Sequence, residues 1–465
     1  MLIALDHPRL ALQALDRALA LDAKSAAAWR MKGEALRLLD QNEAALAALD
    51  QALALEPDDT YALGTKGQVL RALGRQDAAA EVLERAIVLA PEWCWLHDEL
   101  GLLAGYESVL AALDRALAQD PRNPGTLSAK GEALRLLRRY REALDAVSQA
   151  LELAPDDPFA LGTQGQVLRA LKREDEAAAA LLRAVELNPE LPWAYRELGA
   201  LDRHEEALAI LQRAFAQDPQ NRMLLNIMGE LLSEIGAFEK AASMHRQAIA
   251  MSPEDGAAHL GLAWALMLLG RGPEALHAYQ DAMRRKLTDP DRLWARKGLG
   301  DAWMMIGEAA KAQPLFRDLI TEIDRAYHVR DADSLALLGW CHYRLGHFER
   351  SHYEEALRCY SDALALTSDI AAQFDLALVL LCMGREAAAR QEYEWALKLA
   401  AARSRPRQRG LLLVARQDLR EAETLQAAAS PQPAAQLQLA TLPILALLED
   451  RLEEVSAPEA ALEMA

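Results

Sequence analysis

The sequence predicts an all-α fold, a solenoid built from repeated helix pairs, and three observations support this. The segment Lys32–Leu39 (KGEALRLL) recurs letter for letter 98 residues later as Lys130–Leu137. Glycine recurs at spacings of 34, 34 and 30 residues, and the cycle runs twice, through Gly33, Gly67, Gly101, Gly131, Gly165, Gly199 and Gly229. Hydrophobic residues make up 52% of the chain but aromatic residues only 5%, which favours helices packed through small side chains. A fixed period of this length is typical of stacked supersecondary units.

Residue types also recur at fixed positions within each unit. With Ala26 as position 1, large side chains are expected to fill the groove between helices from positions 4, 7, 11 and 24, and small ones at 8, 20 and 27 let the two helices approach. Pro57 at position 32 ends the second helix, and the polar pair after it suits the next helix N-terminus. In the first complete unit these positions hold Trp29, Lys32, Gly33, Leu36, Ala45, Leu49, Ala52 and Pro57.

This pattern resembles the tetratricopeptide repeat, a helix–turn–helix unit of 34 residues. The resemblance implies a right-handed superhelix in which the first helix of each unit lines the concave face. It also implies that positions 2, 5, 9 and 12 of each unit point into that face.

Taken in order, the chain divides into four segments. Residues 1–25 form a leading helix, either half a repeat or a cap, and residues 26–255 form a regular array. The units that start at Cys94 and Pro192 are four residues short, so the first helix or its turn is trimmed by about one turn. Residues 256–402 form a divergent array, and residues 403–465 supply capping helices and an acidic tail.

The divergent array departs from the pattern in two places. We expect the second helix of the unit near Leu293 to continue to about Tyr327, and residues 347–356 to form a doubled turn. The total is about eleven helix pairs after the leading helix. Two further helices are predicted at Gly410–Ala428 and Leu442–Val455. These cap the array, because the last unit otherwise exposes an apolar face.

Composition restricts the class of protein. A formal net charge of −18 argues against a broad surface for nucleic acid or anionic membrane, since phosphate binding needs clustered Lys and Arg. The four cysteines are far apart and form no CxxC pair, which indicates reduced thiols and a cytoplasmic protein. No signal peptide and no apolar run of membrane-spanning length are recognised.

Positions 9 and 12 of the early units repeat one polar pair. A Glu or Gln at position 9 is followed three residues later by Arg, in Glu34/Arg37, Gln68/Arg71, Glu132/Arg135 and Gln166/Arg169. Such a ladder of guanidinium groups suits an acidic or extended peptide, because Arg presents a planar fork to carboxylates and carbonyls. The alternative is a set of solvated pairs within each helix that the duplication of the block has copied.

The corresponding positions of the later units carry aromatic side chains, at Trp264, Trp294, Trp340, Tyr343 and Phe374. Aromatic anchors in a groove are typical of protein-binding hot spots. Two alternatives remain open: these side chains form core, or the C-terminal helices of the same chain fill the groove.

Several specific sites have little support. Tetratricopeptide modules that hold the C-terminal carboxylate of heat-shock chaperones carry Asn at position 9, and no unit here does. Cys341, His342, His347, His352 and Cys359 lie close in sequence but follow no compact metal-ligand motif. No phosphate loop, nucleophile elbow or HExxH motif is present. We therefore expect no metal, no cofactor and no catalysis.

The sequence thus predicts a non-enzymatic scaffold that binds a protein or peptide in the concave groove, and the ladder of arginines favours an acidic one. One alternative is a regulatory or sensory subunit that controls a partner enzyme, of the bacterial defence or signalling type. A less favoured one is an RNA-binding helical repeat. Self-association through the end repeats or the C-terminal helix is compatible with each.

Overall fold

The computed structural model describes residues 8–326, 331–429 and 431–456, and within these ranges it contains 25 α-helices and no strand. The chain separates into two compact units, Met1–Asn188 and Pro189–Ala465, each described here by itself. In the described residues no helix combines the length and apolar character needed to cross a lipid bilayer.

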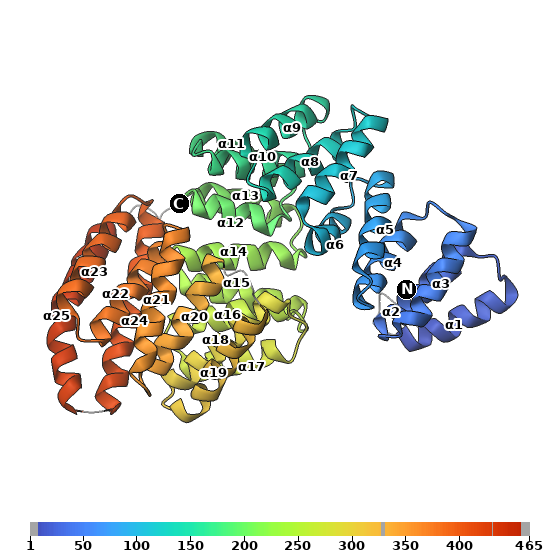
Figure 1. The fold of residues 1–465 in the computed structure, drawn as a ribbon. Helices are drawn as coiled ribbons and strands as arrows, with labels where there is room; N and C mark the ends of the chain where they lie inside the picture. The colour runs from blue at the N-terminus through green and yellow to red at the C-terminus, as the bar shows by residue number, and fades with distance from the viewer. Residues whose placement is uncertain (1–7, 327–330, 430, 457–465) are drawn as a thin grey trace. The chain divides into compact units, whose positions relative to one another are not determined.

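The first unit contains a single helix followed by five helix pairs (Figure 1). The single helix is α1 (Pro8–Leu21), and the prediction of a leading helix holds for the part of residues 1–25 that the structure describes. The pairs are α2 (Ala26–Leu38) with α3 (Asn42–Leu55), α4 (Thr60–Ala72) with α5 (Gln76–Leu89), α6 (Cys94–Ala104) with α7 (Tyr106–Gln119), α8 (Pro124–Leu136) with α9 (Tyr140–Leu153), and α10 (Pro158–Ala170) with α11 (Glu174–Leu187).

The second unit contains six pairs and two longer helices. The pairs are α12 (Pro192–Ala200) with α13 (His204–Gln217), α14 (Arg222–Glu234) with α15 (Phe238–Met251), α16 (Gly256–Leu268) with α17 (Gly272–Met283), α18 (Asp289–Met305) with α19 (Ala309–Ala326), α20 (Ala332–Gly346) with α21 (Ser351–Leu366), and α22 (Ile370–Cys382) with α23 (Glu386–Ala401). The longer helices are α24 (Arg405–Ala429) and α25 (Pro431–Ser456). The twenty-two helices from α2 to α23 therefore form the eleven predicted pairs.

In the regular pairs, the glycine at position 8 sets the closest approach of the two helices. A Cβ atom built on Gly131 would lie 2.2 Å from Cγ2 of Val147, and one built on Gly33 would lie 2.5 Å from Cγ of Leu49. Val147 and Leu49 both occupy position 24, so the contact repeats from unit to unit. The predicted register, with a small residue at 8 facing a large one at 24, is confirmed.

From α2 to α16, the full-length first helices start at a polar cap, whereas the shortened α6 and α12 follow Trp93 and Leu191 and have none. The residue before position 1 accepts a hydrogen bond from a main-chain N–H of the first turn, which satisfies one of the donors left free there. The caps are Ser25, Asp59, Asn123, Asp157, Asn221 and Asp255.

Position 7 was expected to fill the groove within a unit, and the structure corrects this. Lys32, Lys66 and Lys130 each reach the second helix of the preceding unit. Their Nζ atoms lie 2.7, 2.7 and 2.6 Å from Asp16, Asp50 and Asp114 respectively. A long Lys stem can pack against its neighbours while its charged end stays near water, so this position links units rather than filling one.

The short and divergent units differ in where residues are lost or gained. The first helices α6 and α12 have 11 and 9 residues instead of 13, so the trimming falls mainly on the first helix, as one of the two predicted possibilities. The doubled turn predicted after α20 is wrong. The extra residues lengthen both helices, to 15 and 16 residues, and α21 begins at Ser351. Tyr353 packs where a Cβ on Gly346 would lie, which favours an early start of α21.

The C-terminal helices begin earlier than predicted, at Arg405 and Pro431. Proline is tolerated in the first turn of a helix, where its missing N–H would have no partner within the helix. The predicted acidic tail after residue 456 lies outside the described residues.

Candidate functional site

The first helices line the inner side of each array. Within a unit, successive first helices such as α2 and α4, α8 and α10, or α14 and α16 pack directly on one another. Second helices pack chiefly on first helices, with α5 and α7 the exception beside the short α6. Close contact among the first helices places them on the inner side of the curve, where the family resemblance put the binding positions.

Two of the four predicted arginines are held by their own helices. Nε and Nη2 of Arg37 donate to the two carboxylate oxygens of Glu34, both at 2.8 Å. Arg135 binds Glu132 in the same way, both at 2.7 Å. The pairing with Glu34 raises the pKa of Arg37 further, so this guanidinium stays charged. These bidentate pairs leave fewer donors for a partner.

The Gln68/Arg71 pair binds a residue of the next unit. Gln68 donates to Glu99 at 2.9 Å, and Nε of Arg71 donates to the same carboxylate at 3.1 Å. Glu99 belongs to α6, so this carboxylate joins two first helices. The Arg71 side chain stays half-exposed, which makes it the most accessible guanidinium of the three. Gln166 and Arg169 occupy the equivalent positions on α10.

The inner side of the first unit also carries apolar groups that the sequence prediction omitted. Tyr61, Trp95 and Phe159 stand at position 2 of their units, and Leu102 stands at position 9. Tyr61 and Phe159 are exposed, and Leu102 is 79% exposed. Tyr61 and Trp95 have ring centroids 6.2 Å apart. Position 2 was available as a signal, because the family resemblance marks it as inward-facing.

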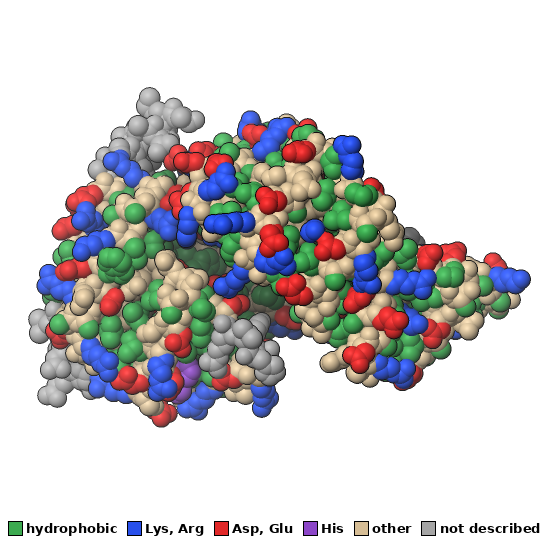
Figure 2. Space-filling view, turned by 45° about the horizontal axis from the view of Figure 1, so that its top comes forward, with side chains coloured by type: hydrophobic (Ala, Val, Ile, Leu, Met, Phe, Trp, Pro, Cys, Tyr) green, Lys and Arg blue, Asp and Glu red, His purple; other side chains and the backbone are tan. Residues whose placement is uncertain are grey.

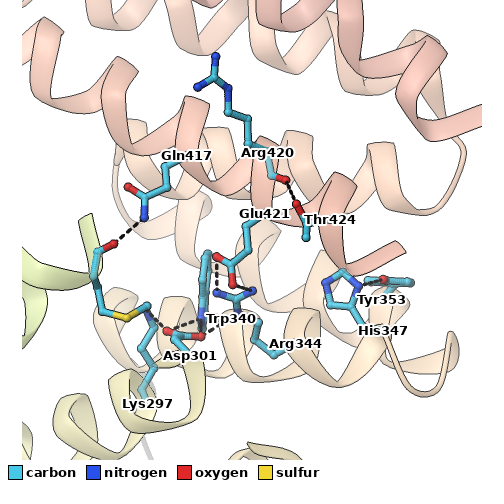
Figure 3. Close-up of polar contacts among 11 residues, drawn as sticks. Lys297, Asp301, Trp340, Arg344, His347, Tyr353, Gln417, Arg420, Glu421 and Thr424 are labelled. Atoms are coloured by element: carbon cyan, nitrogen blue, oxygen red, sulfur yellow. Dashed lines mark hydrogen bonds and ion pairs between the residues drawn. The ribbon is translucent and has the colours of Figure 1, made fainter. Parts of the chain in front are cut away.

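Helix α24 covers the inner side of the second unit. Arg407 forms a salt bridge with Glu234 of α14 at 3.2 Å, and Gln417 donates to the main-chain oxygen of Met267 in α16 at 2.7 Å. Further along the same helix, Glu421 accepts two hydrogen bonds from Arg344 of α20, both at 3.1 Å (Figure 3). Helix α24 also packs on α22 and α23. The C-terminal segment is therefore bound along several first helices as well as on the last pair.

Glycine permits this close packing at one point. A Cβ atom on Gly410 would lie 2.0 Å from the main-chain oxygen of Glu234, which no side chain could tolerate. Helix α24 and the end of α14 are thus in backbone contact.

A buried group of charges fixes α24 to the array (Figure 3). Asp301 of α18 accepts from Nε of Arg344 at 2.7 Å and from Nε1 of Trp340 at 3.0 Å, and Nζ of Lys297 lies 3.0 Å away. Burial alone would raise the pKa of Asp301, but Arg344 and Lys297 hold it below its usual value. With Glu421, the group contains two cations and two anions, so its net charge is zero. Balanced charge with full hydrogen bonding is the condition under which such a group is tolerated inside a protein.

The predicted aromatic residues of the second unit differ in how far their side chains are exposed. Trp340, Tyr343 and Phe374 are 8%, 1% and 4% exposed, so they are core and do not form an open surface. The reason is the presence of α24 and the last helix pairs, which pack over them. Trp264 and Trp294 remain 39% and 44% exposed. The sequence left open whether the C-terminal helices of the same chain fill the groove of the later units. In the second unit, α24 does so.

His342 of α20, His352 of α21 and His347 of the turn between them form polar contacts. Nδ1 of His342 lies 2.9 Å from Nδ1 of His352, and His347 lies 3.2 Å from the hydroxyl of Tyr353. Burial lowers the pKa of His347 to about 3, so this imidazole is neutral. Across the ranges that the structure describes, no three His, Cys, Asp or Glu side chains are grouped as metal ligands would be.

The exposed surface is mixed in charge. Figure 2 shows Lys and Arg side chains interspersed with Asp and Glu over the face that it presents. That face carries no broad patch of positive charge, as expected from the net charge of −18.

Comparison with known proteins gives matches to tetratricopeptide repeat models. These models match residues 39–92, 106–158, 128–192 and 234–288. Superkiller complex protein 3 of Homo sapiens is 28% identical over 124 residues, which cover 27% of this chain and 8% of that protein. The same protein of Mus musculus matches to the same extent. The match thus spans less than a tenth of the length of these curated relatives.

Two solved structures are also similar to this chain. The Cut9 and Hcn1 hetero-tetramer of APC/C gives a TM-score of 0.44 at 17% identity, covering 94% of this chain and 88% of that one. The type IV pilus biogenesis factor PilW gives a TM-score of 0.35 at 20% identity, covering 44% of this chain and 95% of that one.

Stacked helix pairs with a lined inner side define a helical-repeat scaffold, a class that serves protein–protein interaction and is typically non-catalytic. The repeat pattern, the eleven pairs and the matched models identify the chain more closely. It is a tetratricopeptide repeat protein.

Proposed function

We propose that the inner side of the first unit binds an extended segment of a partner protein. The observation that carries the proposal is Leu102, a large apolar side chain that is 79% exposed on a first helix. Aromatic Trp95 and Tyr61 lie at other inward positions of the same and the preceding first helix. The inner side of the second unit is covered by its own α24, whereas the inner side of the first unit has no such helix over it.

The charges on this side narrow the chemistry of the partner. Because Arg37 and Arg135 are each paired with a Glu of their own helix, they contribute little net positive charge. Arg71 shares Glu99 with Gln68 and keeps a half-exposed guanidinium. The segment that fits has an aliphatic or aromatic side chain against Leu102, Trp95 and Tyr61. It also has a carboxylate or carbonyl oxygen within reach of Arg71.

A peptide-display selection tests this on the full chain. A random library is selected against the wild type, and the enriched peptides are then titrated by fluorescence polarisation. Leu102→Asp should weaken binding by about tenfold or more, equal to about 1.4 kcal/mol, because it places a charge in the apolar contact. Arg71→Ala should weaken binding of peptides with an acidic residue by a smaller factor.

Leu21→Asp is the matched control, since Leu21 is exposed in the same unit but lies on α1 rather than on an inward-facing first helix. It should leave the affinity unchanged. Failure to enrich any peptide, or enriched peptides that bind the Leu102→Asp variant as tightly as the wild type, would contradict the proposal.

A further inference from the structure

A cavity of about 360 Å³ lies inside the second unit, beneath α24. Its wall is formed by α12, α14, α15, α16 and α22 on one side and by α24 on the other. The volume is at the lower end of the range for small-molecule sites. It has no counterpart in the repeat pattern, because α24 is not a repeat helix.

The wall carries more negative groups than positive ones. Two arginines line the cavity, Arg196 and Arg407, against the four carboxyls of Glu230, Glu234, Asp375 and Asp418. Arg407 is paired with Glu234 at 3.2 Å. Burial raises the pKa of Glu230, and the charge of Arg196 offsets this only in part. Asp375 of α22 and Asp418 of α24 remain, and within the described ranges neither has a salt bridge to a cation of the chain.

The two aspartates behave as carboxyls that lack a counter-ion. Burial raises the pKa of Asp375 to about 7. Burial, followed by repulsion from Asp375, raises the pKa of Asp418 well above its usual value. The nearby cations Lys297 and Arg344 are engaged with Asp301 and do not cancel this effect.

Two buried polar atoms in the wall also lack a partner. His245 of α15 is 1% exposed, and its Nε2 makes no hydrogen bond to any described residue. Its Nδ1 lies 3.3 Å from Oδ1 of Asn226 and donates to it in the neutral ring, which leaves Nε2 as an acceptor. Burial lowers the pKa of His245 to about 4, consistent with a neutral ring. The hydroxyl of Ser233 is likewise buried without a partner.

The rest of the wall is apolar. Trp264 and Phe374 contribute aromatic surface, and Leu268, Leu411 and Val414 contribute aliphatic surface. A ligand for this cavity therefore needs a hydrogen-bond donor with positive charge at one end and an apolar body at the other. The face of a Trp ring adds to the attraction for a cation.

We propose that the cavity binds an organic ammonium group, with the charged nitrogen at Asp375 and Asp418 and the apolar body against Trp264 and Phe374. The inference concerns the second unit and is independent of the peptide site proposed for the first.

Isothermal titration of the full chain with phenethylamine tests the proposal, with phenethyl alcohol as the uncharged analogue. The amine should bind with saturation and the alcohol at least tenfold more weakly. Asp375→Asn and Asp418→Asn should each weaken amine binding by tenfold or more. Asp362→Asn removes an exposed carboxyl from α21 of the same unit and should leave binding unchanged.

Two further arms keep the result interpretable. Ala371→Trp fills part of the cavity from an exposed position and leaves both aspartates in place, so it should also weaken binding. Each variant is checked by its thermal midpoint, so that loss of binding is separated from loss of fold. In the last experiment, Nα-acetyl-lysine amide, which carries its positive charge on the side chain, replaces phenethylamine as the ligand. Preference for it assigns the ammonium to a side chain of a partner, and preference for phenethylamine assigns it to a small metabolite.

The proposal is overturned if neither amine binds with saturation, if the alcohol binds as well as the amine, or if both aspartate variants bind as the wild type does while remaining folded.

Discussion

Replacing Glu421 by Ala tests how α24 is held against the array. Glu421 supplies one of the two negative charges in the buried group and accepts both of its hydrogen bonds from Arg344. Arg344 is 2% exposed and would keep only Asp301, which it shares with Lys297. The group would then carry one uncompensated positive charge in the interior.

The magnitude follows from the burial of the pair. Removing one partner of a buried ion pair costs about 3–5 kcal/mol, and since the Glu421 side chain retains 13% exposure we expect the lower end, about 3 kcal/mol. Glu421→Gln keeps the shape and one acceptor, so it should cost less, about 1–2 kcal/mol.

Hydrogen exchange of the main-chain amides measures this directly, because it reports the local opening of α24 separately from unfolding of the repeats. A loss of about 3 kcal/mol corresponds to exchange faster by on the order of 100-fold in α24. Glu449→Ala is the control. It removes a carboxylate of α25 that binds Arg420 of α24 in a half-exposed pair, so it should change the opening free energy of α24 by less than about 1 kcal/mol. Equal exchange in the Glu421→Ala and Glu449→Ala variants would refute the assigned role of the buried group.

Three other predictions address the repeats and the cavity. Gly131→Ala should lower stability by about 1–3 kcal/mol, since its Cβ would lie 2.2 Å from Val147, whereas Gly125→Ala in the same helix has ordinary contacts and should be neutral or stabilising. Equal melting temperatures for the two variants would show that the helix register is wrong. Lys66→Ala breaks an ion pair in which the Asp50 side chain is half-exposed, so urea denaturation should detect a loss of at most about 1 kcal/mol in the free energy of unfolding. A larger loss would mean that these ion pairs between units contribute substantially to stability. Asp375 has a folded-state pKa of about 7, above its unfolded value, so it favours the folded state when protonated and this contribution is lost as pH rises from about 4 to 7. Asp375→Asn should therefore gain stability relative to the wild type across that interval and level off above it, and a difference that does not vary with pH would contradict the assignment.

The early repeats show how far sequence alone leads. Gly33, Gly67 and Gly131 mark the close approach of two helices, and the structure places each against the residue at position 24 of its unit. The starts of α4, α8 and α10 each follow a polar cap and a proline in the preceding turn, and both of these signals act locally.

The candidate surface was only partly predictable. The Glu34–Arg37 pair was expected from its spacing of three residues, and it forms. The contact of Arg71 with Glu99 was not, because Glu99 stands at position 6 of the next unit, outside the positions expected to face inward. Tyr61 and Leu102 also occupy inward positions, but they are not part of the polar pair that repeats at positions 9 and 12.

The sequence by itself thus determined the repeated unit, the number of helix pairs and the close approach of the two helices within a regular unit. All of these depend on contacts within one unit or between adjacent ones, and such contacts leave a periodic signal. Only the tertiary structure decided the position of α24. Its partners Met267 and Glu234 lie 150 and 173 residues from the residues they contact. A single helix without a repeat has no period to reveal its partners. Its position depends instead on the shape and charge that the assembled first helices present, above all Arg344, which binds Glu421, and Glu234, which binds Arg407.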